Sequence, residues 1–262
     1  MKKYSLGVFL NIFTKNGSDW QKQINFINSL KKIEHVEIML EETEISKEDI
    51  DFLKRGLKAY NLILHAPFMD ITLLSLHNEI SEASFSVFKK AIQIGRKLGV
   101  KVMTLHMDKY PSFWEKEEAE KRTVFWIKKL AKISPFPISI ENLSFKDHIQ
   151  TTYPSTKDDI LRLAKLVPKN SGLTIDTGHL LHDIVDVIEV LKQTHKSVLN
   201  IHLHDGKKGS AHLKLGDGDL NLQEFFSFLQ KINYDGFVSL EVMGKKEIKE
   251  SWITATKYSN IS

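Results

Sequence analysis

The chain has 262 residues, 42% of them hydrophobic, and its 37 lysines and arginines exceed its 33 aspartates and glutamates by four. This length and composition fit one globular domain, and the mild positive charge permits an anionic ligand or nucleic acid without requiring either. The chain has no cysteine, which excludes disulfides, thiolate metal ligands and cysteine nucleophiles. A transition metal would have to bind His, Asp or Glu.

The first apolar run, Tyr4–Leu10, follows Met-Lys-Lys and superficially resembles a signal peptide. It is short, and the TKNGSDW segment that comes after it offers no small-residue cleavage site, so the run predicts a first strand instead. No stretch is long enough to cross a membrane. We therefore expect a cytoplasmic protein with no membrane partner.

Short β-branched and apolar runs alternate along the chain with amphipathic segments of helical spacing such as SKEDIDFLKRGLKAY. Eight such runs predict strands: Tyr4–Leu10, His35–Leu40, Leu62–Phe68, Val100–Met107, Pro137–Leu143, Gly172–His179, Asn200–Asp205 and Phe237–Met243. Eight strands alternating with helices predict an α/β fold, a single (β/α)₈ TIM barrel over residues 1–262. An open doubly wound sheet is the alternative, but no strand is followed by the Gly-x-Gly-x-x-Gly turn of a dinucleotide site.

Ionisable residues gather where the predicted strands end, which is where barrels of this kind place their chemistry. Histidines occupy these positions on several strands, one more follows in the seventh loop, and carboxylates end three strands: His65, His106, His179, His202 and His212 with Glu141, Asp176 and Glu241. A single strand histidine, taken alone, is more often a buried, hydrogen-bonded core residue than a ligand. Convergence of these residue types from different strands predicts a divalent metal site.

Glu141 and Glu241 each interrupt an apolar run, ISIENL and VSLEVM. A buried carboxylate needs a cation, and no Lys or Arg lies inside the later strands. Of the neighbouring His202 and His204, we expect only His202 to look into the barrel. No role is assigned to five others: His35, His77, His148, His182 and His195.

With these positions located, nearly the whole chain resembles the xylose isomerase-like superfamily of metal-dependent barrels. The resemblance rests on LHAPF (Leu64–Phe68), LGVKVMTLH (Leu98–His106), IEN (Ile140–Asn142), DTGH (Asp176–His179), HLHD (His202–Asp205), HLKLGDGDL (His212–Leu220) and LE (Leu240–Glu241). It implies a metal quartet of Glu141, Asp176, His202 and Glu241, as in the isomerases and epimerases. The apurinic-site endonucleases of the endonuclease IV type add ligands that His65, His106, His179 and His212 match. Ser210 stands where their pattern has an aspartate, and Met107 where it has a glycine.

The resemblance implies two activities. The favoured one is an isomerase or epimerase acting on a keto sugar or sugar phosphate through a metal-stabilised enediolate, with Glu141 and Glu241 as general base and acid. His179 would then contact the substrate, and Lys214 or Lys207 would hold a phosphate. The alternative is a zinc phosphodiesterase acting on abasic DNA. The metal would be Zn, Mn, Mg or Co, with one site expected and two or three possible, and a homo-oligomer is left open.

Overall fold

The computed structural model describes residues 3–12, 17–144 and 150–259. Within these ranges eight parallel strands close into a barrel, and each pairs with the next in chain order until β12 returns to β1. The predicted (β/α)₈ barrel is therefore confirmed. Its strands are β1 (Ser5–Ile12), β2 (His35–Leu40), β3 (Asn61–His65), β4 (Met103–Leu105), β6 (Ile138–Glu141), β8 (Ser171–Asp176), β9 (Val198–Leu203) and β12 (Phe237–Leu240).

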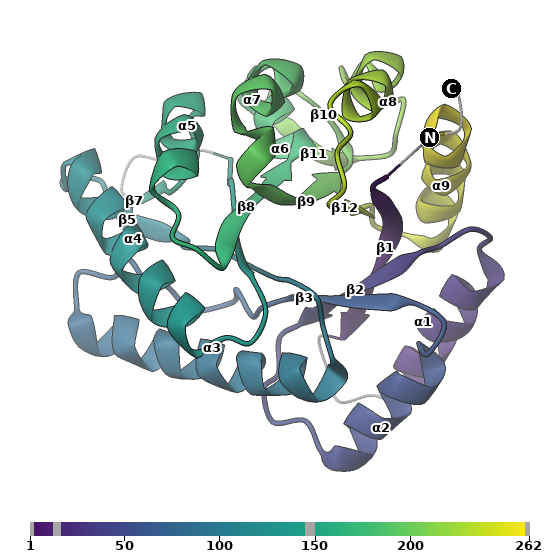
Figure 1. The fold of residues 1–262 in the computed structure, drawn as a ribbon, viewed down its shortest axis with the longest axis horizontal. Helices are drawn as coiled ribbons and strands as arrows, with labels where there is room; N and C mark the ends of the chain where they lie inside the picture. Colours follow the sequence, from purple (N-terminus) through teal and green to yellow (C-terminus); the bar gives the residue numbers. More distant parts are fainter. Residues whose placement is uncertain (1–2, 13–16, 145–149, 260–262) are drawn as a thin grey trace.

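Helices form the outer ring around these strands (Figure 1). They are α1 (Gly17–Ser29), α2 (Lys47–Gly56), α3 (Asn78–Leu98), α4 (Lys116–Ile133), α5 (Lys157–Leu166), α6 (Thr177–His182), α7 (Val187–Thr194), the 3₁₀ turn η1 (His195–Ser197), α8 (Leu222–Lys231) and α9 (Lys245–Ser259). Local signals set their ends: Ser46 and Thr156 begin α2 and α5 with capping boxes, and Gly99 ends α3 at φ 76°. Among the residues described, no helix combines the length and apolar character needed to cross a bilayer.

The two faces of the barrel strands differ in chemistry. On β2, for example, Val36, Ile38 and Leu40 belong to the hydrophobic core, while the alternate residue Glu37 hydrogen-bonds within the barrel. Much of the barrel interior is polar, with buried side chains joined by hydrogen bonds: Glu37, Thr104, Ser139, Thr174, Asn200, His202 and Ser239. The apolar core therefore lies mainly between strands and helices, and the barrel itself holds a polar network.

Several predicted strands end two or three residues earlier than expected, among them β3, β6 and β12. The run Gly172–His179 is a strand only as far as Asp176, whose side chain accepts a hydrogen bond from His179 N at 2.7 Å and so begins α6. The run Val100–Met107 contributes only β4. Two small antiparallel sheets in the loops were not predicted. One pairs β5 (Lys109–Pro111) with β7 (Gln150–Thr152), from two different loops, and the other is a hairpin of β10 (Asp205–Lys207) and β11 (Ser210–Leu213).

Candidate metal and catalytic site

Four side chains from four strands meet at the carboxyl-terminal end of the barrel. Glu141 and Asp176 are the last residues of β6 and β8, His202 lies on β9, and Glu241 directly follows β12. Each offers a ligand atom, and these atoms lie within 4.8 Å of one another. His202 Nδ1 is 3.2 Å from Glu141 Oε1 and 3.1 Å from Glu241 Oε2. The structure thus brings together the quartet selected from the sequence.

The quartet fits a divalent cation. His202 Nδ1 and Glu241 Oε2 are buried, and among the described residues neither finds a hydrogen-bond partner although they lie 3.1 Å apart. A nitrogen lone pair facing carboxylate oxygens at this separation is repulsive unless a proton or a metal ion lies between them. One imidazole with three carboxylates is a donor set that Zn, Mn, Mg or Co can use.

Charge is concentrated in this site. Burial alone raises the pKa of Glu141, but His202 and His106 outweigh it and hold that pKa well below its usual value. Burial likewise opposes ionisation of Asp176, and His179 and His204 nevertheless lower its pKa. Both carboxylates are therefore anionic at neutral pH and available to bind a cation.

A second group of possible ligands, His65 and His106, contacts Oε2 of Glu141, the oxygen that does not face His202. The Nε2 atoms of His65 and His106 are 3.2 and 3.1 Å from Glu141 Oε2, and the two rings are perpendicular, with centroids 4.9 Å apart. His65 Nδ1 is 2.8 Å from the carbonyl oxygen of Ala66. Because a carbonyl only accepts, Nδ1 carries a hydrogen and Nε2 needs a cation to face a carboxylate. This group could hold a second ion, with Glu141 between the two positions.

A third group combines His179, His204 and His212, but its geometry is less suitable for a metal. The rings of His204 and His212 are stacked, with centroids 4.2 Å apart and planes inclined by 19°. A metal ion lies close to the plane of each imidazole that binds it, so one ion cannot serve both rings in this arrangement. Both ring nitrogens of His204 moreover already have neighbours, since Nδ1 lies 2.8 Å from His212 N and Nε2 lies 2.8 Å from Asp176 Oδ2.

The expectation for His204 was wrong. Residues two apart on a strand share a face, and β9 ends at Leu203 in any case. Both His202 and His204 are fully buried, and the latter supports Asp176. Burial lowers the pKa of His204, but the charge of the Asp176 carboxylate and its hydrogen bond outweigh that effect and raise the pKa to about 9. The HLHD motif contains both histidines, and their spacing of two residues could have predicted that His204 lies on the same side as His202.

The sequence reasoning also missed Glu37, which is fully buried on β2 and lies 3.2 Å from His202 Nε2 through Oε1. Its signal was the same one that identified Glu141, a carboxylate in an apolar run, here HVEIML. Among the histidines given no role, His35 is a hydrogen-bonded interior residue between Ser5 and Ser239. His148 lies outside the described residues.

A cavity of about 450 Å³ opens above the quartet. Its lining includes most of the predicted site residues together with apolar side chains: His65, His106, Glu141, His179, His212 and Glu241 with Phe9, Met39, Phe68, Met69, Leu143, Val242 and Met243. Such a cavity suits a small molecule. Among the residues that the structure describes, the wall of this cavity includes Lys109, whose side chain ends in an ammonium group and which the sequence did not single out.

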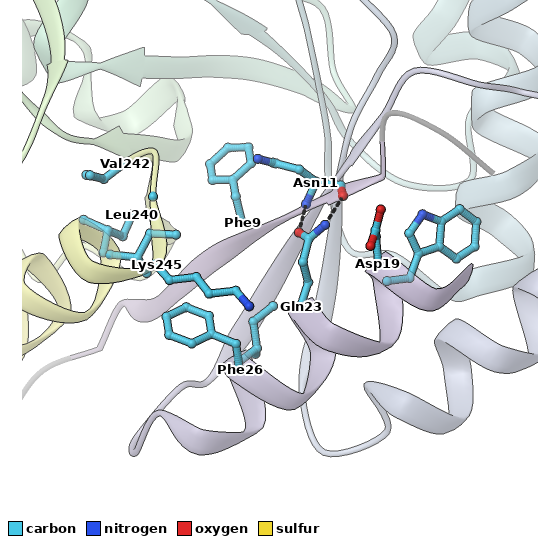
Figure 2. A pocket seen from close by; sticks show the side chains of 12 residues that line it. Phe9, Asn11, Asp19, Gln23, Phe26, Leu240, Val242 and Lys245 are labelled. Atoms are coloured by element: carbon cyan, nitrogen blue, oxygen red, sulfur yellow. Dashed lines mark hydrogen bonds between the residues drawn. The ribbon is translucent and has the colours of Figure 1, made fainter. Parts of the chain in front are cut away.

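A second cavity, of about 480 Å³, adjoins the first and shares Phe9, Asn11 and Val242 with it. Figure 2 shows it between β1, α1 and the beginning of α9, where Gln23 hydrogen-bonds the backbone of Asn11 and Lys245 extends toward Phe26. Its lining is mainly apolar. The site therefore has room beside the quartet for more than the reacting atoms of a ligand.

The expected contact of Lys214 with a substrate gains no support from the structure. Its ammonium is hydrogen-bonded to Glu250 Oε2 of α9 at 2.9 Å, and Lys214 is not among the residues that line the cavity. Lys207, on β10, is exposed and is not in the lining either. The unpredicted β10–β11 hairpin accounts for the difference, because it redirects the chain between His202 and His212.

A closed parallel barrel with carboxylates and histidines gathered at its carboxyl-terminal end is the arrangement that barrel enzymes use for their active sites. The family described as xylose isomerase-like TIM barrel matches residues 26–258, and the chain belongs to it. An uncharacterized protein of Methanocaldococcus jannaschii is 26% identical over 217 residues, which cover 78% of this chain and 73% of that protein. An inosose dehydratase of Mesomycoplasma hyopneumoniae is 28% identical over 232 residues, which cover 76% of this chain and 75% of the dehydratase.

Solved structures share the fold. A D-tagatose 3-epimerase-like protein superposes with a TM-score of 0.82 at 22% identity, over 98% of this chain and 97% of the other. A D-psicose 3-epimerase from Clostridium cellulolyticum H10, solved with D-tagatose, has a TM-score of 0.77 at 16% identity. The superposition covers 97% of this chain and 98% of the epimerase. At these identities the likeness establishes the architecture alone.

Proposed function

We propose that the protein is a divalent-metal-dependent isomerase or epimerase acting on a keto sugar or sugar phosphate. The observation that carries the proposal is the placement of Glu141 and Glu241. Both carboxylates approach His202 Nδ1, at 3.2 and 3.1 Å, and both line the 450 Å³ cavity. With two carboxylates at one ligand cavity, one can remove a proton from the substrate as general base and the other can return a proton as general acid.

The ion would be held by Glu141, Asp176, His202 and Glu241, and when bound it would polarise a substrate carbonyl and acidify the neighbouring C–H bond. One of Glu141 and Glu241 then removes that proton and the other returns one. Return to the opposite face of the same carbon is epimerisation. Return to the neighbouring carbon is isomerisation, in which the hydroxyl proton also moves to the former carbonyl oxygen. His179, in the wall of the same cavity with its Nδ1 3.0 Å from the carbonyl oxygen of Asn142, presents its other nitrogen to a substrate hydroxyl.

The named relatives support this chemical class. The structural neighbours include proteins named for 3-epimerisation of keto sugars, and a sequence relative is named for dehydration of inosose. Dehydration next to a carbonyl begins with the same proton removal and differs in the step that follows, the loss of a hydroxyl group. The first proton transfer, rather than the final product, is therefore the common element that we assign to this chain.

A zinc phosphodiesterase is the second candidate, and one observation favours it. His65 and His106 converge on Glu141 Oε2 while the quartet uses Oε1, so two ions could share this carboxylate. Paired ions with a bridging carboxylate clamp a phosphoryl group. The third group argues against three ions, because His204 and His212 are stacked on each other.

The test is exchange of the substrate proton with solvent. Purified protein, stripped and then loaded with Mn, Mg, Co or Zn in turn, is incubated in deuterated water with a panel of ketohexoses, ketopentoses and their phosphates. We expect deuterium at the carbon next to the carbonyl, together with an epimer or isomer, and loss of both after chelation. Absence of exchange with every keto substrate under every metal would contradict the proposal.

A further inference from the structure

Glu37 is a carboxylate at the centre of the barrel, fully buried on β2. Its two oxygens have different partners. Oε2 accepts a hydrogen bond from Asn200 Nδ2 at 2.9 Å, and Oε1 lies 3.2 Å from His202 Nε2. A buried carboxylate is costly to folding, and apolar side chains of similar volume usually serve a core as well or better. Its presence here calls for a role that an apolar residue could not fill.

The contact with Glu37 determines which nitrogen of His202 is available. An ionised carboxylate only accepts hydrogen bonds, so the Nε2 atom that faces it carries a hydrogen. In the neutral ring the lone pair is then on Nδ1, the atom that points at Glu141 Oε1 and Glu241 Oε2. The carboxylate also prevents the ring from turning about its Cβ–Cγ bond. Glu37 thus presents the ligand atom of His202 to the quartet.

Glu37 is itself held in place by a hydrogen-bonded series. Asn200 donates through Nδ2 to Glu37 Oε2 and, at 3.3 Å, to Thr104 Oγ1. Asn200 Oδ1 accepts from Ser239 Oγ at 3.3 Å. Partners on both ends of the amide fix its orientation, so its NH₂ group faces the carboxylate and its oxygen faces away. The series joins β2, β4, β9 and β12, and it makes the position of Glu37 a property of the whole barrel.

We propose that Glu37 is a positioning residue, which holds His202 in the tautomer and ring orientation that leave Nδ1 to bind the metal ion. A carboxylate that accepts the second N–H of a metal-bound histidine both orients the ring and increases its basicity, and loss of such a partner typically weakens metal binding about 10–100-fold. This role presupposes the metal site of the proposed function but not the reaction on a sugar.

The test measures metal binding, without substrate. Apo-protein is titrated with Co²⁺, and both the affinity and the visible absorption of the bound ion are recorded for wild type, Glu37→Gln and Asp159→Asn. Asp159 is a matched control, because it is a buried carboxylate that accepts backbone hydrogen bonds at the start of α5, away from the barrel. We expect Glu37→Gln to weaken Co²⁺ binding about 10–100-fold and to change the absorption spectrum. Asp159→Asn should lower the thermal midpoint while keeping wild-type affinity and spectrum.

Wild-type affinity and spectrum in Glu37→Gln would overturn the proposal, as would equal losses in Glu37→Gln and Asp159→Asn. If Glu37→Gln does not fold, Glu37→Asp takes its place. It keeps the charge and withdraws the carboxylate by one methylene, so the affinity for Co²⁺ should still fall, and unchanged affinity counts against the role.

A double variant adds a direct check, since Glu37→Gln should have no further effect on Co²⁺ affinity once His202→Asn is present. Wild-type protein that binds no Co²⁺ would refute the metal site and this role together. Tight Co²⁺ binding without sugar chemistry would refute only the proposed reaction.

Discussion

His202 Nδ1 lies 3.2 Å from Glu141 Oε1 at the carboxyl-terminal end of the barrel, and both side chains are buried. Such an approach of a ring nitrogen to a carboxylate requires a cation, which is either a proton on the ring or a metal ion. In the metal-free protein, burial lowers the pKa of His202, but Glu141, Glu37 and Glu241 together raise it well above its usual value. A metal ion would replace that proton.

Replacing Glu141 with Gln should have the largest effect on metal binding. Glu141 contacts His202 through Oε1 and both His65 and His106 through Oε2, so the variant weakens both candidate ion positions at once. We expect wild type to hold at least one ion per chain by elemental analysis. The affinity of Glu141→Gln should fall by more than the factor of about 10–100 seen when only a supporting partner of a ligand is removed. Glu82→Gln, at an exposed ion pair with Lys129, is the control. Equal metal content in Glu141→Gln and wild type would remove Glu141 from the site.

Metal affinity should rise with pH through the neutral range. The pKa of His202 is raised well above its usual value, and hydrogen bonding to Glu141 raises that of His65 despite burial. The His202 ring therefore keeps its proton in the metal-free protein at neutral pH, and the His65 ring keeps one to higher pH than a free imidazole, so an ion that binds His202 must displace a proton. Calorimetry in buffers of different ionisation enthalpy measures the protons released. Binding that releases no proton and does not depend on pH would contradict the assignment of His202 Nδ1 as a ligand atom.

Replacing Glu241 with Gln should reduce turnover more than it changes substrate binding. Glu241 directly follows β12 and lines the cavity, where it would act in proton transfer. Loss of a general acid or base typically lowers the rate about 10²–10⁴-fold. The measurement is kcat and solvent deuterium exchange at saturating metal, so that a weakened ion site is not mistaken for lost chemistry. Exchange at the wild-type rate in Glu241→Gln would exclude it as base or acid.

Lys214→Met should leave KM unchanged for any sugar phosphate that the enzyme accepts. The Lys214 ammonium is hydrogen-bonded to Glu250, and the residue does not line the cavity. Lys109 does line it, so Lys109→Met serves as the contrasting variant and should raise KM for a phosphorylated substrate above that for the free sugar. A selective rise of KM in Lys214→Met would instead restore the role expected from the sequence.

Incision of abasic-site DNA should be slow or absent. With Ser210 in place of an aspartate, a third ion position lacks a charged oxygen ligand, and the stacked His204 and His212 do not replace it. The measurement is cleavage of a duplex with one abasic site after loading with zinc, alongside zinc content per chain. Three zinc ions per chain with metal-dependent incision that Glu141→Gln abolishes would favour the phosphodiesterase over the isomerase.

Periodicity in the sequence was sufficient for the architecture. Apolar runs such as HVEIML and ISIENL alternate with amphipathic segments, and that order allows few arrangements other than a parallel barrel. Because such a barrel gathers the ends of its strands at one face, the sequence alone predicts that Glu141, Asp176 and His202 lie near one another. Their position at strand ends is a local property that the sequence contains.

Tertiary structure decided how those groups act on one another. Glu37 and His202 are 165 positions apart, and their 3.2 Å contact exists only because the barrel brings β2 and β9 to a common interior. The hairpin β10–β11 likewise places His212 over His204 and turns Lys214 toward Glu250. Such contacts depend on strand register and on loop geometry, whose hydrogen bonds join residues that no local pattern relates. The sequence by itself therefore determined which residues reach the mouth of the barrel, and the closed fold decided which of their atoms face one another.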